Sequence, residues 1–281
     1  MRINKNIASI NIYREYSKNL IKQSSSLGRI SSGIKINSAK EDPNGMAKSE
    51  RFRMQIRGLQ MAGNNAQDGV SMLQGAEGGL EGITSSLQRV RELLVEAGGT
   101  NTDEDKEIIQ KEINQMLDGA DDMANNTEFN GVKLLSGGNN DGKTSVLPMV
   151  IGTNVGEKID IPRYNLTTEG LGLKTGTTVN VDVDNIGGSL DLVDKALHDI
   201  VRDRSKFGAL ENRFQSTYDS ITELSDKTET AESSIRDTDM ATEMMEYSKE
   251  NILIEAGNAM MVQSNQLPQD ALKVLENVRS R

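Results

Sequence analysis

The chain has 281 residues and carries 32 Lys and Arg against 42 Asp and Glu, a formal net charge of −10 at pH 7. It has no Cys and one His, His198, so disulfides, thiolate metal sites, a Cys nucleophile and any site with two His ligands are excluded. Aromatic residues make up only 3% of the sequence, and the acidic balance disfavours an electrostatic nucleic-acid binder.

The N-terminus lacks the apolar core of a cleaved secretory signal, because Arg2, Lys5 and Arg14 interrupt it. No window approaches the uncharged apolar length that a membrane-spanning helix needs. We therefore expect no membrane partner, and either a cytoplasmic protein or one exported without a cleaved signal.

The N-terminal half predicts three helices. The first segment, to about residue 34, has the three-and-four apolar spacing of a coiled-coil seam. Pro43 suits the first turn of a second helix with Asp42 as its N-cap, and the stretch 98–103 ends that helix. Thr102 or Asp103 can cap a third. Seam residues of the first helix are Ile3, Ile7, Ile10, Leu20, Leu27, Ile30 and Ile34.

Residues 136–190 have a different composition, rich in turn-forming residues and β-branched side chains. Ser145–Ile151 and Lys158–Ile161 are expected to form a hairpin, because short β-rich runs flank a Gly-containing loop. Alternating valines in Thr177–Val183 predict a third strand.

The C-terminal half predicts two more helices. The first, from about 189 to 235, would be about 70 Å long and needs a partner along its length. Its core positions recur every seven residues: Val193, Ile200, Phe207, Phe214 and Ile221. The last helix has a further seam: Met244, Tyr247, Ile254, Met261, Leu272 and Leu275. The predicted fold is mainly α, with antiparallel coiled-coil helices from both halves forming a rod and a small β-hairpin insert.

No catalytic, cofactor or metal site is predicted. His198 lies beside a core position, and a packing or solvated role explains it. The carboxylates of Asp118, Asp121 and Asp122 face no second cluster, and the turns near Asp141 and Asp182 lack the complete calcium-loop pattern. We therefore do not expect an enzyme.

A series of motifs resembles bacterial flagellin, in the family's order and over nearly the whole chain. These motifs are Met1–Asn6, Ser31–Ala39, Gln55–Leu59, Asn65–Gly69, Gln74–Gly78, Gln88–Leu93, Glu128–Leu135, Ile151–Asn154, Gly208–Phe214 and Ser264–Gln269. The chain departs from the family at Gly79, where Ala is more usual and where Gly should cost the helix roughly 1 kcal/mol.

The resemblance implies a subunit that polymerises into the flagellar filament for swimming motility, without large outer domains. It implies an N-terminal inner-tube helix (1–40), two parts of an outer-tube rod (41–135 and 191–238), a hairpin with a short variable insert (136–190) and a C-terminal inner-tube helix (239–281).

The resemblance also implies partners. The main partner is the protein itself, in a helical homopolymer on the outside of the cell, secreted without a cleaved signal. Flagellar cap and hook-junction proteins and an export chaperone at the C-terminal segment are further expected partners. Toll-like receptor 5 is another, through the family's contact positions Gln88, Arg89, Leu93 and Glu112.

Two alternatives remain at the level of the sequence. A hook–filament junction protein shares the terminal coiled coils. A secreted coiled-coil effector or adhesin that does not polymerise would satisfy the periodicity, but not the ordered motifs.

Overall fold

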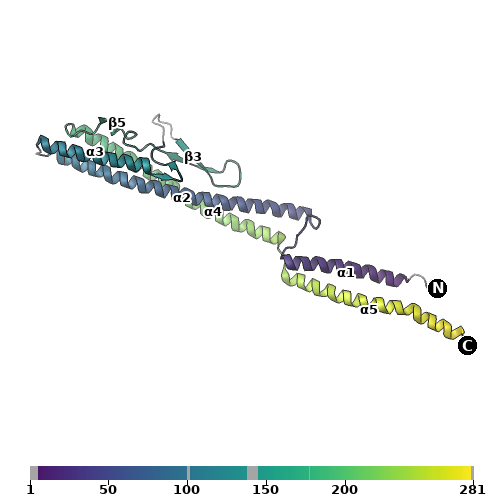
Figure 1. The fold of residues 1–281 in the computed structure, drawn as a ribbon. Helices are drawn as coiled ribbons and strands as arrows, with labels where there is room; N and C mark the ends of the chain where they lie inside the picture. The colour runs from purple at the N-terminus through teal and green to yellow at the C-terminus, as the bar shows by residue number, and fades with distance from the viewer. Residues whose placement is uncertain (1–5, 100–101, 138–144, 177, 280–281) are drawn as a thin grey trace. The chain divides into compact units, whose positions relative to one another are not determined.

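The computed structural model describes residues 6–99, 102–137, 145–176 and 178–279. The fold is mainly α, as the sequence predicts (Figure 1). The helices are α1 (Ile7–Ser32), α2 (Pro43–Ala97), α3 (Asp103–Asn126), α4 (Ile186–Arg236) and α5 (Met240–Arg279). Three separate antiparallel strand pairs lie between α3 and α4: β1 (Glu128–Phe129) with β2 (Val132–Lys133), β3 (Ser145–Val150) with β4 (Lys158–Arg163), and β5 (Lys174–Thr175) with β6 (Thr178–Val179).

The chain divides into two compact units. The terminal unit comprises Met1–Met54 and Thr228–Arg281, and the central unit comprises Gln55–Lys227. The resemblance implies boundaries of the terminal domains at residues 40 and 239, whereas the compact units divide within α2 and α4.

Helices α2 and α4 are antiparallel in the central unit. Gln74 on α2 donates a 2.7 Å hydrogen bond to Glu211 on α4. Further along, Arg91 is 2.7 Å from Asp194. Helix α3 lies along the same bundle and buries Ile109, Ile113, Leu117, Ala120 and Ala124.

The core of the central unit contains the heptad residues of α4. Val193, Ile200 and Phe214 are 0% exposed, Phe207 is 3% exposed and Ile221 is 8% exposed. The first four pack with apolar side chains from α2, α3 and the strand region, whereas Ile221 packs with Leu59 and Ala62 of α2. This unit therefore buries most of its large apolar side chains by itself.

The helix ends follow local sequence signals. Asp42 Oδ1 accepts from the backbone N–H groups of Asn44 and Gly45 at 3.0 Å, and α2 begins at Pro43. Thr102 caps α3 through a capping box with Asp105. These starts are the ones that the sequence predicts.

The strands agree with the sequence in part. The β3–β4 hairpin is where it was expected. The β1–β2 hairpin was not predicted, although Asn130-Gly131, with φ of 49° and 78°, is a strong signal for a two-residue hairpin turn.

The prediction of a third strand over Thr177–Val183 is wrong for most of its length. Only Thr178–Val179 pairs, with β5, and Thr177 lies outside the described residues. The Gln110 side chain on α3 instead donates to the Val181 carbonyl and accepts from the Val183 N–H, both at 3.0 Å. Because a side chain satisfies this backbone, it needs no neighbouring strand.

Glycines on α2 allow a close approach of other elements. A Cβ at Gly69 would lie 2.9 Å from the Phe214 ring. A Cβ at Gly79 would lie 2.5 Å from Thr127 Oγ1 and 2.9 Å from Leu135 Cδ1. The sequence predicts that Gly79 only weakens its helix, but in the fold it makes room for the chain that follows α3.

Candidate assembly surface

Helices α1 and α5 form an antiparallel pair within the terminal unit. Asn6 Nδ2, before α1, donates a 2.8 Å hydrogen bond to the carbonyl of Ser264, late in α5. At the other end, Arg29 lies 3.6 Å from Glu243, early in α5. The spacing of these contacts requires opposite chain directions.

Local sequence signals set the ends of this pair. Asn6 caps α1 by accepting from Ser9 N–H, and Gly33 ends α1 with a left-handed φ of 70°. Asp239 caps α5, because its carboxylate accepts from the hydroxyl and N–H of Thr242 and from Ala241 N–H. These hydrogen bonds lower the pKa of Asp239 below its usual value.

The connection between α1 and α2 contacts the connection between α4 and α5 beside the pair. Lys35 N–H donates to the Arg236 carbonyl at 2.7 Å, and Thr238 N–H donates to the Gly33 carbonyl at 3.1 Å. The Arg236 guanidinium lies 3.1 Å from Glu50. That hydrogen bond is the main reason that the pKa of Glu50 lies below its usual value.

The interior of the α1–α5 pair is polar. Ser26, Glu243, Glu250 and Ser264 are its buried residues, and Gln23 Nε2 donates to Asn251 Oδ1 across the pair. Among the side chains that the structure describes in these two helices, no large apolar one falls in the buried class. The pair therefore gains little hydrophobic stabilisation within one chain.

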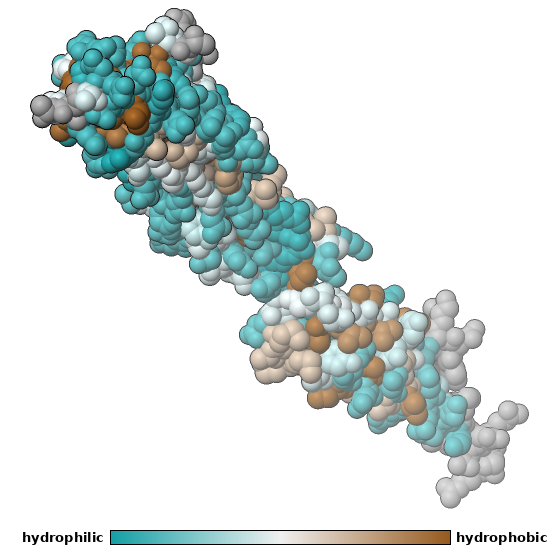
Figure 2. All heavy atoms as spheres, turned by 60° about the vertical axis from the view of Figure 1, so that its left-hand side comes forward, coloured by the Kyte–Doolittle hydropathy of each residue, from teal (hydrophilic) through white to brown (hydrophobic). Residues whose placement is uncertain are grey.

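Many large apolar side chains of this pair are exposed instead. Figure 2 shows hydrophobic residues spread over the surface of the terminal unit. We call this set the apolar terminal surface: Ile7, Ile10, Tyr13, Leu20, Ile21, Leu27, Met240, Met244, Met245, Ile252, Leu253, Met260, Val262 and Leu267, each at least 40% exposed.

A hollow of about 450 Å³ lies within this surface. Its walls come from both helices of the pair, mainly Leu20, Ile21 and Leu27 from α1 and Tyr247 from α5. An apolar hollow of this kind can accept side chains from another helix.

The structure divides the predicted seam residues into three groups. Ile7, Ile10, Leu20, Leu27 and Met244 are exposed. Half-buried positions are Ile30, Ile34, Tyr247, Ile254 and Met261. Ile3 lies outside the described residues, and so do the side chains of Leu272 and Leu275.

Sequence reasoning missed the outer part of the surface. Ile21, Met245, Ile252 and Met260 lie beside the seam rather than in it. An apolar face wider than one seam was the available signal, because a helix that contacts a single partner needs only a narrow stripe.

The predicted receptor contacts lie on α2 and α3 in the central unit. Gln88 and Arg89 are exposed and Glu112 is half-buried, whereas the Leu93 side chain is only 1% exposed, in the core. Arg89 bridges Glu92 at 3.2 Å and Glu112 at 3.1 Å. The hydrogen bond to Glu112 is the largest cause of the raised pKa of Arg89.

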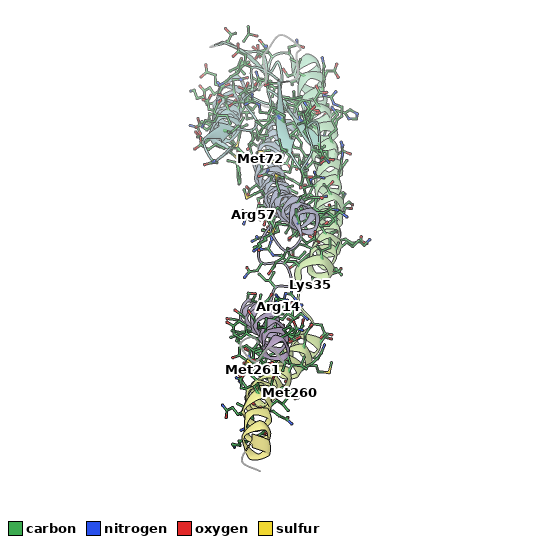
Figure 3. The ribbon with its side chains drawn as sticks, turned by 90° about the vertical axis from the view of Figure 1, so that its right-hand side faces the viewer. Arg14, Lys35, Arg57, Met72, Met260 and Met261 are labelled. Atoms are coloured by element: carbon green, nitrogen blue, oxygen red, sulfur yellow. The ribbon has the colours of Figure 1, made fainter. Side chains whose placement is uncertain are left out.

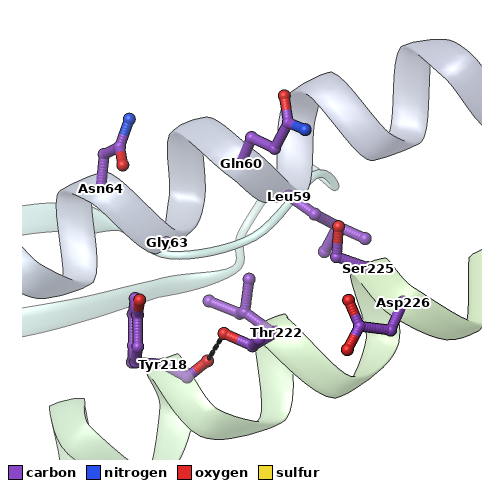
Figure 4. A pocket seen from close by; sticks show the side chains of 9 residues that line it. Leu59, Gln60, Gly63, Asn64, Tyr218, Thr222, Ser225 and Asp226 are labelled. Atoms are coloured by element: carbon purple, nitrogen blue, oxygen red, sulfur yellow. Dashed lines mark hydrogen bonds between the residues drawn. The ribbon is translucent and has the colours of Figure 1, made fainter. Parts of the chain in front are cut away.

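A second hollow, of about 220 Å³, lies between α2 and α4 (Figure 4). Gly63 leaves space opposite Tyr218, whose carbonyl accepts a 2.9 Å hydrogen bond from the Thr222 hydroxyl. The remaining lining, including Gln60, Asn64 and Ser225, shows no arrangement of nucleophile, acid and base.

Within the described ranges, no group of three or more His, Asp or Glu side chains is placed to hold a metal ion. In the same part of the chain, no helix combines the length and apolar character needed to cross a membrane.

The fold and this surface define a class: a mainly helical protein whose terminal helix pair exposes large apolar side chains. The profile described as the bacterial flagellin N-terminal helical region matches residues 3–140, and that of the bacterial flagellin C-terminal helical region matches residues 190–275. The chain belongs to the bacterial flagellin family.

Similar proteins agree with this assignment. A flagellin of Bacillus subtilis is 40% identical, covering 98% of this chain and all of the relative. The flagellar filament core protein flaB2 of Brachyspira hyodysenteriae is 36% identical with the same coverage. A putative flagellar hook-associated protein from Vibrio parahaemolyticus is similar in fold, with a TM-score of 0.57 and 15% identity over 70% of this chain and 100% of that one.

Proposed function

We propose that the protein is a structural subunit that polymerises into the flagellar filament and so serves swimming motility. The observation that carries this proposal is the apolar terminal surface on a helix pair whose own interior is polar. So many exposed large apolar side chains favour a partner, because their contact with water is unfavourable.

Copies of the same chain are the partners that fit best. A surface that wraps a helix pair presents different patches to different neighbours, and such heterologous contacts produce an open helical filament rather than a closed ring. The family's name and the relatives described as filament core proteins support the same role. They favour it over a hook–filament junction protein or a secreted effector that does not polymerise.

The net charge of −10 opposes this assembly, because every subunit adds the same sign of charge. Salt screens charges that are exposed, so filament growth should accelerate as salt rises. A salt series in which growth stays constant or slows would contradict this mechanism.

Electron microscopy of the purified monomer after addition of ammonium sulfate tests the proposal directly. We expect uniform filaments from the wild type. A double variant, Leu27→Ser with Ile252→Ser, should remain monomeric, since it places two hydroxyls in the apolar terminal surface. The control, Val201→Ser, changes a valine of the central unit that is 56% exposed and should still polymerise.

Monomers alone in the wild type, with intact termini, would overturn the proposal. Filaments from the Leu27→Ser, Ile252→Ser variant at the wild-type threshold concentration would show that assembly uses another surface.

The proposed location is the extracellular flagellar filament. The expected partners at its two ends are the cap and hook-junction proteins, and before export a chaperone would bind the C-terminal segment. The apolar side chains of α5 support the last of these, because an unassembled subunit exposes them. We also propose that the protein has no enzymatic role, which a hydrolase screen of the purified chain would test.

We further propose recognition by Toll-like receptor 5 through Gln88, Arg89 and Glu112. Arg89 supports this proposal, because its exposed guanidinium is held in place by Glu112 on the neighbouring helix. Leu93 is left out, since its side chain lies in the core. Arg89→Asp should weaken receptor signalling, with Arg57→Asp, elsewhere on α2, as the control. Unchanged signalling by Arg89→Asp would refute the assignment.

A further inference from the structure

The methionines of the two units lie in different environments. Helix α5 contains five of the chain's 13 methionines. Met240, Met244, Met245 and Met260 are 44%, 48%, 66% and 53% exposed. In the central unit, by contrast, Met72 is 3% exposed (Figure 3).

Packing in the central unit also protects other methionines. The Met123 sulfur lies against Gly82, and the Met149 sulfur lies against Gly69, where a Cβ would come within 2.6 Å and 2.8 Å of them. Met61 is the exception among the described residues of this unit, at 60% exposed. It provides an internal control of similar exposure outside the apolar terminal surface.

We propose that three exposed methionines of α5, Met244, Met245 and Met260, are oxidation sites that switch off assembly. A hydroperoxide is the chemical class of oxidant. The thioether sulfur attacks the terminal O–H oxygen of the peroxide, and the O–O bond breaks as the S–O bond forms. The proton on the attacked oxygen passes to the leaving oxygen, which departs as water from hydrogen peroxide or as an alcohol from an organic hydroperoxide. The sulfur is oxidised by two electrons and the peroxide is reduced by the same two.

The product places a polar sulfoxide in a surface that has to be dehydrated when subunits pack. Methionine side chains are flexible and apolar, so they adapt to neighbours of different shape, and a sulfoxide loses this property. Oxidation of Met244, Met245 and Met260 therefore makes the apolar terminal surface less suited to other copies, while Met72 and the rest of the buried core stay reduced.

The inference rests on the proposed polymerisation. It adds a reciprocal expectation: assembled subunits cover these sulfurs, so filaments should be oxidised more slowly than monomers at the α5 methionines. The monomer is then the form that an oxidant inactivates.

The test compares hydrogen peroxide treatment of three full-length proteins: the wild type, the variant Met244→Leu, Met245→Leu, Met260→Leu, and the control Met61→Leu. Leucine keeps the apolar volume but has no sulfur, so all three should polymerise before treatment. Mass spectrometry of peptides reports oxygen addition at each methionine, and sedimentation reports the threshold concentration for polymerisation.

We expect peroxide to raise the threshold of the wild type and of Met61→Leu by about tenfold or more, and that of the triple variant by less than about twofold. Equal loss in all three proteins, or an unchanged threshold in the oxidised wild type, would overturn the inference. Failure of the untreated wild type to polymerise would instead refute the proposed function, and this inference with it.

Discussion

The central and terminal units solve the problem of hydrophobic burial in opposite ways. In the central unit, Leu80, Leu87 and Phe214 are 0% exposed, and α2, α3 and α4 share a large apolar core. In the terminal unit, the α1–α5 pair buries Ser26 and Glu250 and leaves Leu20 and Ile21 in contact with water.

This difference separates folding from assembly. A unit that has buried its apolar side chains gains little from meeting another copy, whereas a unit that displays them gains stability only when another copy covers them. The buried polar groups of the terminal unit can fix how α1 and α5 align, as polar core residues do in coiled coils.

The largest expected effect comes from removing the terminal unit's second helix. Deletion of residues 240–281 should abolish filament formation, because α1 loses the helix that it contacts. The thermal unfolding of the central unit should stay close to that of the full chain. Electron microscopy and circular dichroism would measure the two results, and filaments from the truncated protein would refute the role given to α5.

A pair of alanine substitutions tests the comparison by stability. Phe214→Ala should lower the free energy of unfolding by about 3–5 kcal/mol, since it leaves a cavity in the core of the central unit. Leu27→Ala should change it by less than about 0.5 kcal/mol, because that side chain is 52% exposed.

In assembly, the order of the two substitutions should reverse, so that Leu27→Ala has the larger effect. Leu27→Ala is expected to raise the threshold concentration for polymerisation, and denaturant unfolding with sedimentation would give both quantities. If Leu27→Ala destabilised the monomer as much as Phe214→Ala, the two units would not differ as described.

Two glycines of α2 offer a finer test of packing in the central unit. Gly79→Ala should destabilise by about 1–3 kcal/mol, because the new methyl group would collide with Thr127 and Leu135. Gly78→Ala has no atom within 4 Å of its new methyl group and should stabilise by up to about 1 kcal/mol. Thermal melting would distinguish the two variants. Stabilisation by both would show that helix propensity alone determines the effect of a methyl group at these positions.

The smallest expected effect concerns pH and the start of α5. Hydrogen bonds from Thr242 and Ala241 lower the pKa of Asp239 in the folded chain. The contribution of the Asp239 charge to the stability of the folded chain is therefore complete above the ordinary aspartate pKa. It is lost as the pH falls through the lower pKa of the folded state.

The matched variant is Asp239→Asn, which still caps the helix but does not titrate. Its helical signal in circular dichroism should fall less steeply on acidification than that of the wild type. Identical acid titrations of the two proteins would contradict the stabilising role of the Asp239 charge.

Much of the fold was predictable because its signals are local. Pro43 after Asp42, the Thr102 cap and the seven-residue spacing from Val193 to Ile221 each act through the nearest turns of chain. The ordered motifs identified the family for the same reason, since they are read from the sequence directly.

The early end of the strand after β5 was not predictable in this way. Val181 and Val183 alternate as a strand does, but Gln110 on α3 takes their backbone hydrogen bonds. The role of Gly79 was also not predictable. Its low helix propensity is a local property, but the need for space beside Thr127 arises because the chain after α3 returns to α2.

The sequence by itself determined the helices, the starts of α2 and α3, the β3–β4 hairpin and the family. Only the tertiary structure decided that Phe207 is enclosed while Leu27 is exposed, although both occupy apolar positions with coiled-coil spacing. Periodicity states which side chains share a face of a helix. Whether that face is covered depends on the other elements of the chain, and the terminal unit leaves many of its apolar side chains exposed.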